Sequence, residues 1–189
     1  MTMLERSACI MPLTKRILDI VAAAAGLILL APVFVLVAIL VTSTSRGPFL
    51  FRQERVGRDE RTFICNKFRT MHQGTAQRGT HEISRDALTP AGSFLRKLKL
   101  DELPQLWNVF LGEMSLVGPR PCLPNQKTLI AERRARNVFC VPPGITGLAQ
   151  IQNVDMSEPQ RLAEIDQIYI RTRSFGGDLK LIFRTFFGG

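Results

Sequence analysis

The sequence has few of the residues that metal centres and nucleic-acid interfaces usually require. It contains two histidines, and its four cysteines form no Cys-x-x-Cys pair, which argues against a zinc site. One tryptophan and one tyrosine offer few rings for stacking on bases, so nucleic acid is not an expected partner. We interpret the widely spaced cysteines as reduced cytosolic thiols: Cys9, Cys65, Cys122 and Cys140.

Acidic side chains are also in the minority. The chain has 16 Asp and Glu residues against 25 Lys and Arg, which gives a net charge of +9. A basic balance of this kind indicates an anionic partner, such as a lipid headgroup or a phosphorylated substrate. The length of 189 residues is enough for one compact domain and a membrane element.

Charge is absent from one long stretch near the N-terminus. Ile20 to Val41 contains no charged residue. As a helix it would be roughly 33 Å long, which is enough to cross the hydrocarbon core of a bilayer. The apolar region of a cleaved signal peptide is shorter, about 7–15 residues, so this interpretation fits badly. Pro32 lies in the middle and predicts a kink, because proline removes a backbone donor.

The kinked run has two open interpretations, a bent spanning helix and a re-entrant hairpin with both ends in the cytoplasm. Lys15 and Arg16 precede the run, and Arg46 and further arginines follow it. Positive charge on both sides does not orient a single span, whereas a re-entrant element would show it. We expect Asp19, at the entry to the run, to form an interfacial ion pair with Lys15 or Arg16.

The segment after the apolar run alternates apolar and basic residues. Phe49 to Met71 is therefore predicted to be a short hairpin or an extended segment, with a turn at Gly57. The polar stretch from Gly74 to Asp86 is predicted to be a mobile loop. Thr89 and Pro90 are typical of a helix start, and we expect a basic helix that ends near Leu100.

Pro104 prevents this helix from continuing through the next acidic pair. We expect a second helix with Asp101 as its N-cap and Gly112 as its stop. Further helices are predicted at Leu129 to Phe139 and at about Glu158 to Thr172. Apolar residues near the C-terminus recur at helical spacing, which suits either a helix in the membrane interface or one packed on the core.

Asp101 and Glu102 are the candidates for chemistry, since they stand together in a strongly basic segment. A helix N-terminus would lower the pKa of Asp101 and attract phosphate. The carboxylate could bind Mg²⁺ or act as a nucleophile on phosphorus. The alternative is a simple helix cap with an acidic first turn.

Arg120 lies between two prolines in a rigid loop, and we expect it to grip phosphate through its planar guanidinium. Lys67 and Arg69 could hold phosphate too, or only solvate a strand. Asp166 and Tyr169 lie one turn apart on a predicted helix, and this spacing alone does not indicate a function. Three further arginines are interpreted as a lipid-facing or solvated basic face: Arg133, Arg134 and Arg136.

Taken in order, five motifs resemble those of the bacterial sugar transferase family, the monotopic phosphoglycosyl transferases. The resemblance runs from about Lys15 to Thr185, nearly the whole chain. The motifs are Lys67-Phe68-Arg69-Thr70-Met71, Phe94-Leu95-Arg96, Leu100-Asp101-Glu102-Leu103-Pro104-Gln105-Leu106-Trp107-Asn108-Val109, Met114-Ser115-Leu116-Val117-Gly118-Pro119-Arg120-Pro121 and Pro143-Gly144-Ile145-Thr146-Gly147-Leu148-Ala149-Gln150.

The resemblance implies a membrane enzyme that transfers a sugar 1-phosphate from a UDP-sugar to a polyprenol phosphate and releases UMP. It implies Mg²⁺ as cofactor, a place in the cytoplasmic (inner) membrane with the catalytic domain on the cytoplasmic face, and downstream glycosyltransferases as partners. The oligomeric state stays open between a monomer and a homodimer. A non-catalytic basic membrane protein that binds lipid or another partner is the alternative.

The resemblance also assigns roles to residues. Asp101 corresponds to the family's nucleophile and is expected to bind the metal, and Glu102 would assist, either as an acid or base or by positioning the metal and the acceptor. The family's re-entrant helix breaks near a Ser-Pro pair, which here is Ala31-Pro32. Four further matches are positions that bind phosphate or shape the site: Lys67, Arg69, Arg96 and Arg120. Asp166, Tyr169 and Asp178 match the family's C-terminal pattern, and the first two are assigned to substrate or phosphate binding.

We therefore expect a helix-rich α+β fold. Residues 1–46 would form the N-terminal segment with its re-entrant or kinked membrane helix. Residues 47–189 would form a compact catalytic domain with amphipathic helices at the membrane interface. Because no further long apolar run occurs, the chain is expected to be the minimal catalytic form.

Overall fold

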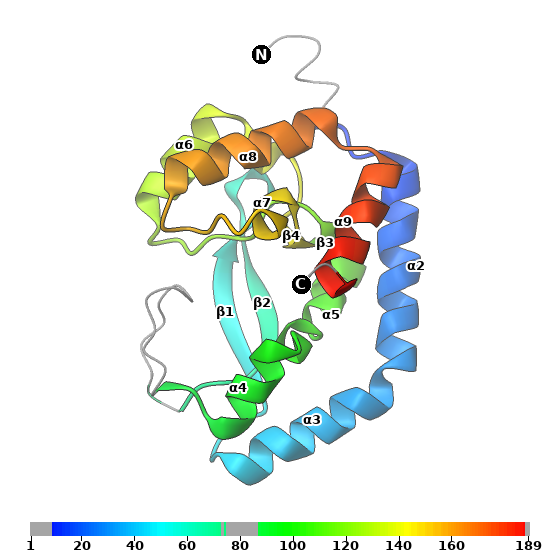
Figure 1. Ribbon diagram of the computed structural model, residues 1–189, viewed down its shortest axis with the longest axis vertical. Helices are drawn as coiled ribbons and strands as arrows, with labels where there is room; N and C mark the ends of the chain where they lie inside the picture. Colours follow the sequence, from blue (N-terminus) through cyan, green and yellow to red (C-terminus); the bar gives the residue numbers. More distant parts are fainter. Residues whose placement is uncertain (1–8, 73, 75–86, 188–189) are drawn as a thin grey trace.

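Two N-terminal helices form a bent arm along one side of a helix-rich α+β body (Figure 1). The computed structural model describes residues 9–72, 74 and 87–187. Helix α2 spans Leu13–Leu29 and α3 spans Ala31–Thr44, with a bend of 61° between them. The expected class, helix-rich α+β, is confirmed.

The bend occurs at the predicted Ala31-Pro32 pair. Pro32 lies in the first turn of α3, where its missing backbone N–H costs no hydrogen bond. The two helices together meet the length and composition of a membrane element, and no single helix in the described part does so. The surrounding membrane, and the choice between a re-entrant and a spanning arm, stay predictions.

Asp19 at the base of the arm does not form the predicted interfacial ion pair. Its side chain is fully buried, and its Oδ1 accepts the backbone N–H of Leu116 at 3.0 Å. Lys15 pairs instead with Asp178 of the C-terminal helix, at 2.7 Å. The expectation considered only neighbours along the helix, whereas the fold brings in partners from distant segments.

Arg16 fixes the arm to helix α5, which spans Gln105–Leu111. Its guanidinium donates to the carbonyl oxygens of Val109 (2.8 Å) and Phe110 (2.9 Å), near the C-terminal end of that helix. These carbonyls have few partners within the helix, and a cation there is favoured by the helix dipole. Gly112 ends α5 in the left-handed conformation, as predicted.

The predicted hairpin is confirmed. Strand β1, Leu50–Val56, pairs antiparallel with β2, Thr62–Phe68, and the chain turns after Gly57. The buried Asn108 joins β2 to α5, because its amide accepts from Asn66 and donates to the Ile64 carbonyl. The predicted loop at 74–86 lies outside the described residues except for Gly74.

Helix α4, Pro90–Lys97, begins as predicted, with the Thr89 hydroxyl accepting from the Gly92 N–H at 2.9 Å. It ends three residues before Leu100. Lys99 then takes a left-handed conformation, with φ 56°, and starts a separate 3₁₀ turn, η4 (Leu100–Glu102). Asp101 lies inside this turn, so the prediction that it caps the next helix is wrong.

Two strands of three residues each lie at the centre of the body. Strands β3 (Ser115–Val117) and β4 (Gly144–Thr146) run parallel, and both belong to motifs of the family resemblance. Gly144 meets Gly118 so closely that a Cβ on Gly144 would lie 2.1 Å from the Gly118 nitrogen. The remaining elements are α6 (Lys127–Ala135), η5 (Val138–Cys140), α7 (Leu148–Ile151), α8 (Pro159–Thr172) and α9 (Phe175–Phe187).

Buried apolar side chains join these elements in adjacent clusters. One cluster packs α3 on β2 and α4 through Val41, Phe68 and Leu95. Another brings together α2, β2 and α5, and further clusters lie beneath α6, α8 and α9. The arm is therefore part of the hydrophobic core on one side and exposed on the other.

Two of the cysteines do not fit the expectation of four reduced thiols. Cys9 and Cys140 form a disulfide with their Cα atoms 5.3 Å apart, so the expectation is wrong for this pair. The two residues are 131 positions apart, and only the packing of the N-terminal segment against the body brings them together. Cys65 and Cys122 are buried free thiols.

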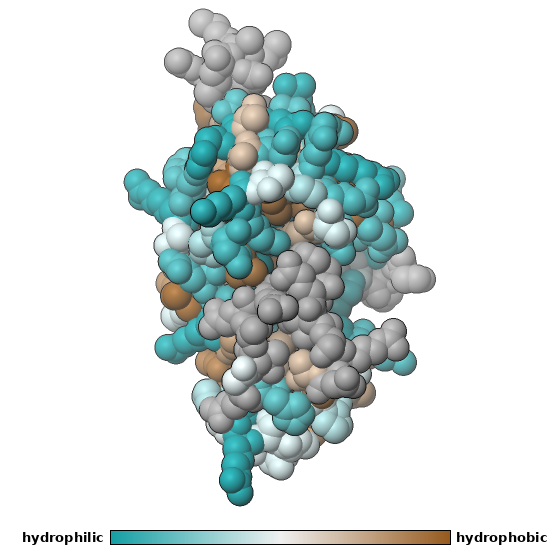
Figure 2. All heavy atoms as spheres, turned by 90° about the vertical axis from the view of Figure 1, so that its left-hand side faces the viewer, coloured by the Kyte–Doolittle hydropathy of each residue, from teal (hydrophilic) through white to brown (hydrophobic). Residues whose placement is uncertain are grey.

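Exposed apolar side chains are concentrated on the arm and on α5 and α9. The opposite face of the molecule, which Figure 2 shows, is mostly hydrophilic. This asymmetry suits helices that lie at a membrane interface, which stays a prediction. The large exposed side chains on α5 and α9 are Trp107, Phe110, Leu111, Phe175, Leu179 and Phe183.

Candidate active site

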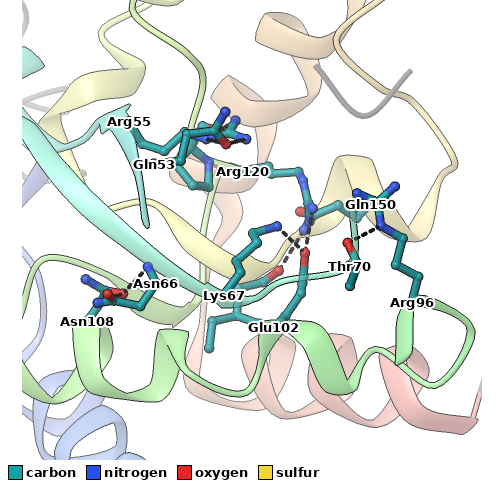
Figure 3. A network of polar contacts seen from close by, with 12 residues as sticks. Gln53, Arg55, Asn66, Lys67, Thr70, Arg96, Glu102, Asn108, Arg120 and Gln150 are labelled. Carbon is teal, nitrogen blue, oxygen red and sulfur yellow. Dashed lines mark hydrogen bonds and ion pairs between the residues drawn. The ribbon is translucent and has the colours of Figure 1, made fainter. Parts of the chain in front are cut away.

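Glu102 is the centre of a network of charged side chains (Figure 3). Its Oε1 accepts from Lys67 Nζ at 2.9 Å and from Arg120 Nη2 at 2.6 Å. Lys67 comes from β2, Arg120 from the loop after β3, and Glu102 from the turn η4. Three segments far apart in the sequence therefore meet at one carboxylate oxygen, through charge-assisted hydrogen bonds.

The two cations keep Glu102 ionised. Burial opposes its ionisation, but the charges of Arg120 and Lys67 outweigh this effect and hold the pKa of Glu102 far below its usual value. The charge of Glu102 in turn raises the pKa of Arg120. Glu102 is thus an anion over the whole physiological pH range and fixes the position of both cations.

Asp101, the residue next to Glu102, differs from it both in its contacts and in the direction of its pKa shift. It is 8% exposed, and no hydrogen bond or ion pair holds its side chain among the described residues. Burial raises the pKa of Asp101, and the nearby charge of Lys67 offsets this only in part. The expected lowering of this pKa is wrong, because burial outweighs the surrounding positive charge.

Arg96 lies on the other side of the acidic pair, on α4. Its Nε donates to the Thr70 hydroxyl at 3.0 Å. Burial lowers the pKa of Arg96, and the charges of Asp101 and Glu102 act against this. The structure therefore brings together the acidic pair and three of the predicted phosphate-binding residues around it.

Arg69 does not join this group. Its Nη2 donates to the backbone carbonyl (2.8 Å) and to the hydroxyl (2.9 Å) of Ser45, at the end of α3. Its other guanidinium nitrogens are buried and have no hydrogen-bond partner among the described residues. The structure thus places Arg69 where the arm meets the body, and its predicted role in phosphate binding stays a prediction.

Asp166 lies behind the site, in a buried ion pair with Arg133. Their Oδ2 and Nη2 atoms are 2.7 Å apart, and the side chains are 4% and 2% exposed. Arg133 also donates to the backbone carbonyl of Arg120 at 2.8 Å. The interpretation of Arg133 as part of a solvated basic face is therefore wrong, since the packing of α6 on α8 buries it.

Tyr169 also lies behind the site. Its hydroxyl oxygen lies 2.9 Å from Asp178 Oδ1 and 3.0 Å from the carbonyl oxygen of Val117, so that its single proton is shared between two acceptors. Asp19 holds the N–H of Leu116 from the other side, so β3 is fixed at consecutive residues just before the loop that carries Arg120. Asp166 and Tyr169 therefore contact the framework of the site, and their predicted contact with substrate stays a prediction.

A cavity of about 400 Å³ opens beside Glu102 and Arg120, within the size range of small-ligand sites. Sequence analysis assigned roles to Glu102 and Arg120 in this lining, but gave none to the motif residues Thr146 and Gln150. The lining residues are Lys99, Glu102, Leu103, Leu106, Leu116, Arg120, Ile145, Thr146, Gln150, Ile151, Asn153, Ile182 and Thr185.

The acidic pair fits a metal ion only in part. The described residues contain no group of three or more Asp, Glu, His or Cys side chains that could hold one. Mg²⁺ is commonly bound by one or two carboxylates together with substrate phosphates. Asp101 and Glu102 therefore fit a Mg²⁺ ion whose other ligands come from a bound diphosphate.

Comparison with known proteins gives a match over almost the full chain. The model of a family described as bacterial sugar transferase matches residues 10–188. A UDP-glucose:undecaprenyl-phosphate glucose-1-phosphate transferase from Klebsiella pneumoniae is 39% identical over 186 residues, which cover 93% of this chain and 40% of that protein. A protein of the same name from Caulobacter vibrioides is 41% identical and is matched over 68% of its length by 92% of this chain.

The relatives differ in the sugar that their names give. A UDP-N-acetylgalactosamine-undecaprenyl-phosphate N-acetylgalactosaminephosphotransferase from Aeromonas hydrophila is 37% identical over 90% of this chain and 42% of that protein. The chain thus spans about two fifths of two of these relatives and about two thirds of the third. The chain is similarly close to relatives named for glucose and to one named for N-acetylgalactosamine, so the identity values do not indicate the sugar.

Proposed function

Because the chain belongs to the bacterial sugar transferase family, we propose that it transfers a sugar 1-phosphate from a UDP-sugar to a polyprenol phosphate such as undecaprenyl phosphate, with release of UMP. The single observation that carries the chemistry is the acidic pair. Asp101 is buried and not held by the described side chains, while Glu102 is bound to Lys67 and Arg120. One carboxylate is thus available to react, and its neighbour organises the cations.

In the first step, a carboxylate oxygen of Asp101 attacks the β-phosphorus of the donor. The bond between that phosphorus and the bridging oxygen breaks, UMP leaves, and the sugar phosphate stays covalently bound to Asp101. Lys67, Arg96 and Arg120 stabilise the charge that develops on the phosphate oxygens and on the leaving UMP. Glu102 cannot serve as an acid near neutral pH, because its pKa lies far below that range.

In the second step, a phosphate oxygen of the polyprenol phosphate attacks the phosphorus of this intermediate. Asp101 leaves as a carboxylate, and the product is a polyprenol diphosphate sugar. Asp101 and Glu102 would hold Mg²⁺ together with the donor's phosphates, where the ion would neutralise part of the diphosphate charge. The cations around Glu102 would hold the anionic groups in both steps.

We place this reaction at the cytoplasmic face of the inner membrane, with the arm α2–α3 inserted from that side. The product would pass to downstream glycosyltransferases in the synthesis of O-antigen, capsule, exopolysaccharide or glycoprotein glycans. The alternative, a non-catalytic basic lipid- or partner-binding protein, accounts for the charge and the apolar arm. It gives no reason for a buried carboxylate that has no partner among the described side chains and lies beside three cations, and this observation favours the enzyme.

UMP release provides the test of this function. The protein in nanodiscs, supplied with Mg²⁺, undecaprenyl phosphate and a panel of UDP-sugars, should release UMP over many turnovers with at least one donor, and in a single turnover only when the acceptor is left out. UDP-glucose, UDP-galactose and UDP-N-acetylgalactosamine belong in the panel. A folded protein that binds the lipid but releases no UMP from any donor would favour the non-catalytic alternative.

The raised pKa of Asp101 predicts the acid side of the pH profile. Only the ionised carboxylate attacks phosphorus, so kcat/KM for UMP release should fall as the pH drops through the pKa of Asp101. Because burial raises this pKa, the fall should begin above the pH at which an ordinary aspartate titrates. Rates measured from about pH 4 to pH 9, with circular dichroism as the folding control, test this; an acid limb at or below the ordinary value contradicts it.

A further inference from the structure

We propose that the cavity of about 400 Å³ beside Glu102 and Arg120 binds the first isoprene units of the acceptor, with the acceptor's phosphate at its cationic end. The inference rests on the proposed function and assigns one of the two substrates to a specific part of the site. The donor would then occupy the side of the acidic pair on which Arg96 and Thr70 lie (Figure 3).

The walls of the cavity are largely aliphatic. Its apolar side chains come from the segment η4–α5, both short parallel strands, α7 and α9, so that they surround the space from several sides. Such a surface suits a branched hydrocarbon chain, since burial of apolar area is the main source of its affinity. The aliphatic residues are Leu103, Leu106, Leu116, Ile145, Ile151 and Ile182.

Several polar groups on the cavity wall already have partners within the protein. The hydroxyls of Thr146 and Thr185 lie 2.6 Å apart, and the Thr185 hydroxyl donates to a backbone carbonyl of α9. The Gln150 amide nitrogen donates to the Ile145 carbonyl, whereas the Gln150 side-chain oxygen is buried without a hydrogen-bond partner among the described residues. A uracil and ribose in this space would bury several polar atoms against a wall whose hydroxyls and Gln150 amide nitrogen are already paired, which is costly. These contacts favour the prenyl chain over the nucleoside.

The charged residues of the cavity fit a phosphate at one end. Lys99 and Arg120 are the two basic residues in its lining, and Glu102 is the acidic one. Lys99 Nζ donates to the Thr185 carbonyl at 3.0 Å, which holds the lysine between η4 and α9. An amphiphile with one anionic headgroup therefore matches a cavity that combines aliphatic walls with an excess of positive charge.

One side chain of the cavity wall, Leu106, contacts the N-terminal arm. Leu106 lines the cavity and packs against Gly26 of α2, where a Cβ would lie 2.9 Å from Leu106 Cδ1. α5 and α9, which both contribute to the wall, carry exposed apolar residues such as Trp107 and Phe183. A lipid that leaves the bilayer along this apolar side would reach the cavity without crossing the hydrophilic face shown in Figure 2.

Filling the cavity tests the proposal. Ile182→Trp, on α9, should raise KM for undecaprenyl phosphate by at least about tenfold, because the indole takes the space of the prenyl chain. UMP release in a single turnover without acceptor should be unchanged. Leu179→Trp is the matched control, since Leu179 lies on the same helix, is 43% exposed and does not line the cavity. It should leave both quantities unchanged.

A binding measurement separates this inference from the proposed function. Farnesyl phosphate, titrated calorimetrically into the unmodified protein without donor, should bind more tightly than inorganic phosphate and at least about tenfold more tightly than to Ile182→Trp. This result supports the cavity assignment even if no UMP is ever released. If Ile182→Trp does not fold, Ile151→Phe on the α7 side replaces it.

Two results would overturn the assignment. Equal farnesyl phosphate binding by the unmodified and the filled protein means that the chain lies elsewhere. A raised KM for the UDP-sugar with an unchanged KM for the lipid would assign the cavity to the donor's nucleoside instead.

Discussion

Replacement of Asp101 by asparagine is expected to lower UMP release by on the order of 10³-fold or more, because the amide cannot attack phosphorus. The substitution keeps the size of the side chain and removes a charge whose burial is unfavourable, so the fold should not suffer. Intact-mass spectrometry after incubation with donor alone should show a sugar phosphate adduct on the unmodified protein and none on the variant.

The matched control is Asp59→Asn. Asp59 is also the middle residue of a three-residue 3₁₀ turn, η1 (Arg58–Glu60), but its side chain is 61% exposed and far from the acidic pair in sequence. This variant should keep full activity and form the adduct. If Asp101→Asn retains a substantial fraction of the activity, or if the adduct maps to Glu102, then Asp101 is not the nucleophile.

Replacement of Asp166 by asparagine is expected to lower the free energy of unfolding by about 3–5 kcal/mol, because it leaves Arg133 buried without a countercharge. Both side chains of this pair are almost fully buried, and Arg133 also holds the backbone of Arg120. Urea denaturation followed by circular dichroism measures the change. Replacing both partners, as in Arg133→Met with Asp166→Leu, should recover part of the stability, since no charge is then buried.

The exposed pair Arg134–Glu60 supplies the control for the buried one. Its side chains are 63% and 34% exposed, so Glu60→Gln should leave the denaturation midpoint almost unchanged. The same variants test the predicted contact of Asp166 with substrate. If Asp166→Asn keeps its stability but loses affinity for the donor, then Asp166 binds substrate and its role in the framework is minor.

Local sequence signals predicted many of the elements. Pro32 determines the bend of the arm, Thr89 and Pro90 start α4, and Gly112 ends α5, each through backbone geometry that a few neighbouring residues decide. The alternation of apolar and basic residues predicted the hairpin, since side chains alternate across a strand. The expected N-cap at Asp101 failed because the left-handed Lys99 opens a separate turn, which no local pattern indicated.

At the acidic pair, too, the sequence predicted the residues, whereas their properties depend on the fold. The motifs identified Asp101 and Glu102 as candidates, but the two carboxylates have opposite pKa shifts that the sequence does not distinguish. The difference comes from Lys67 and Arg120, which are 35 and 18 positions from Glu102 and both bind its Oε1. Their contact depends on how β2, η4 and the loop after β3 pack, which is a property of the whole fold.

The apolar arm with its break, the order of the motifs and the family they belong to could all be predicted from the residues, because these depend on composition and on short-range backbone preferences. Which charges are buried, and with which partners, depends on how distant segments pack. Asp19 on Leu116, Arg133 with Asp166, and the Cys9–Cys140 disulfide all join distant segments. Burial makes such contacts strong and raises the pKa of Asp101, and burial is known only when every segment is in place.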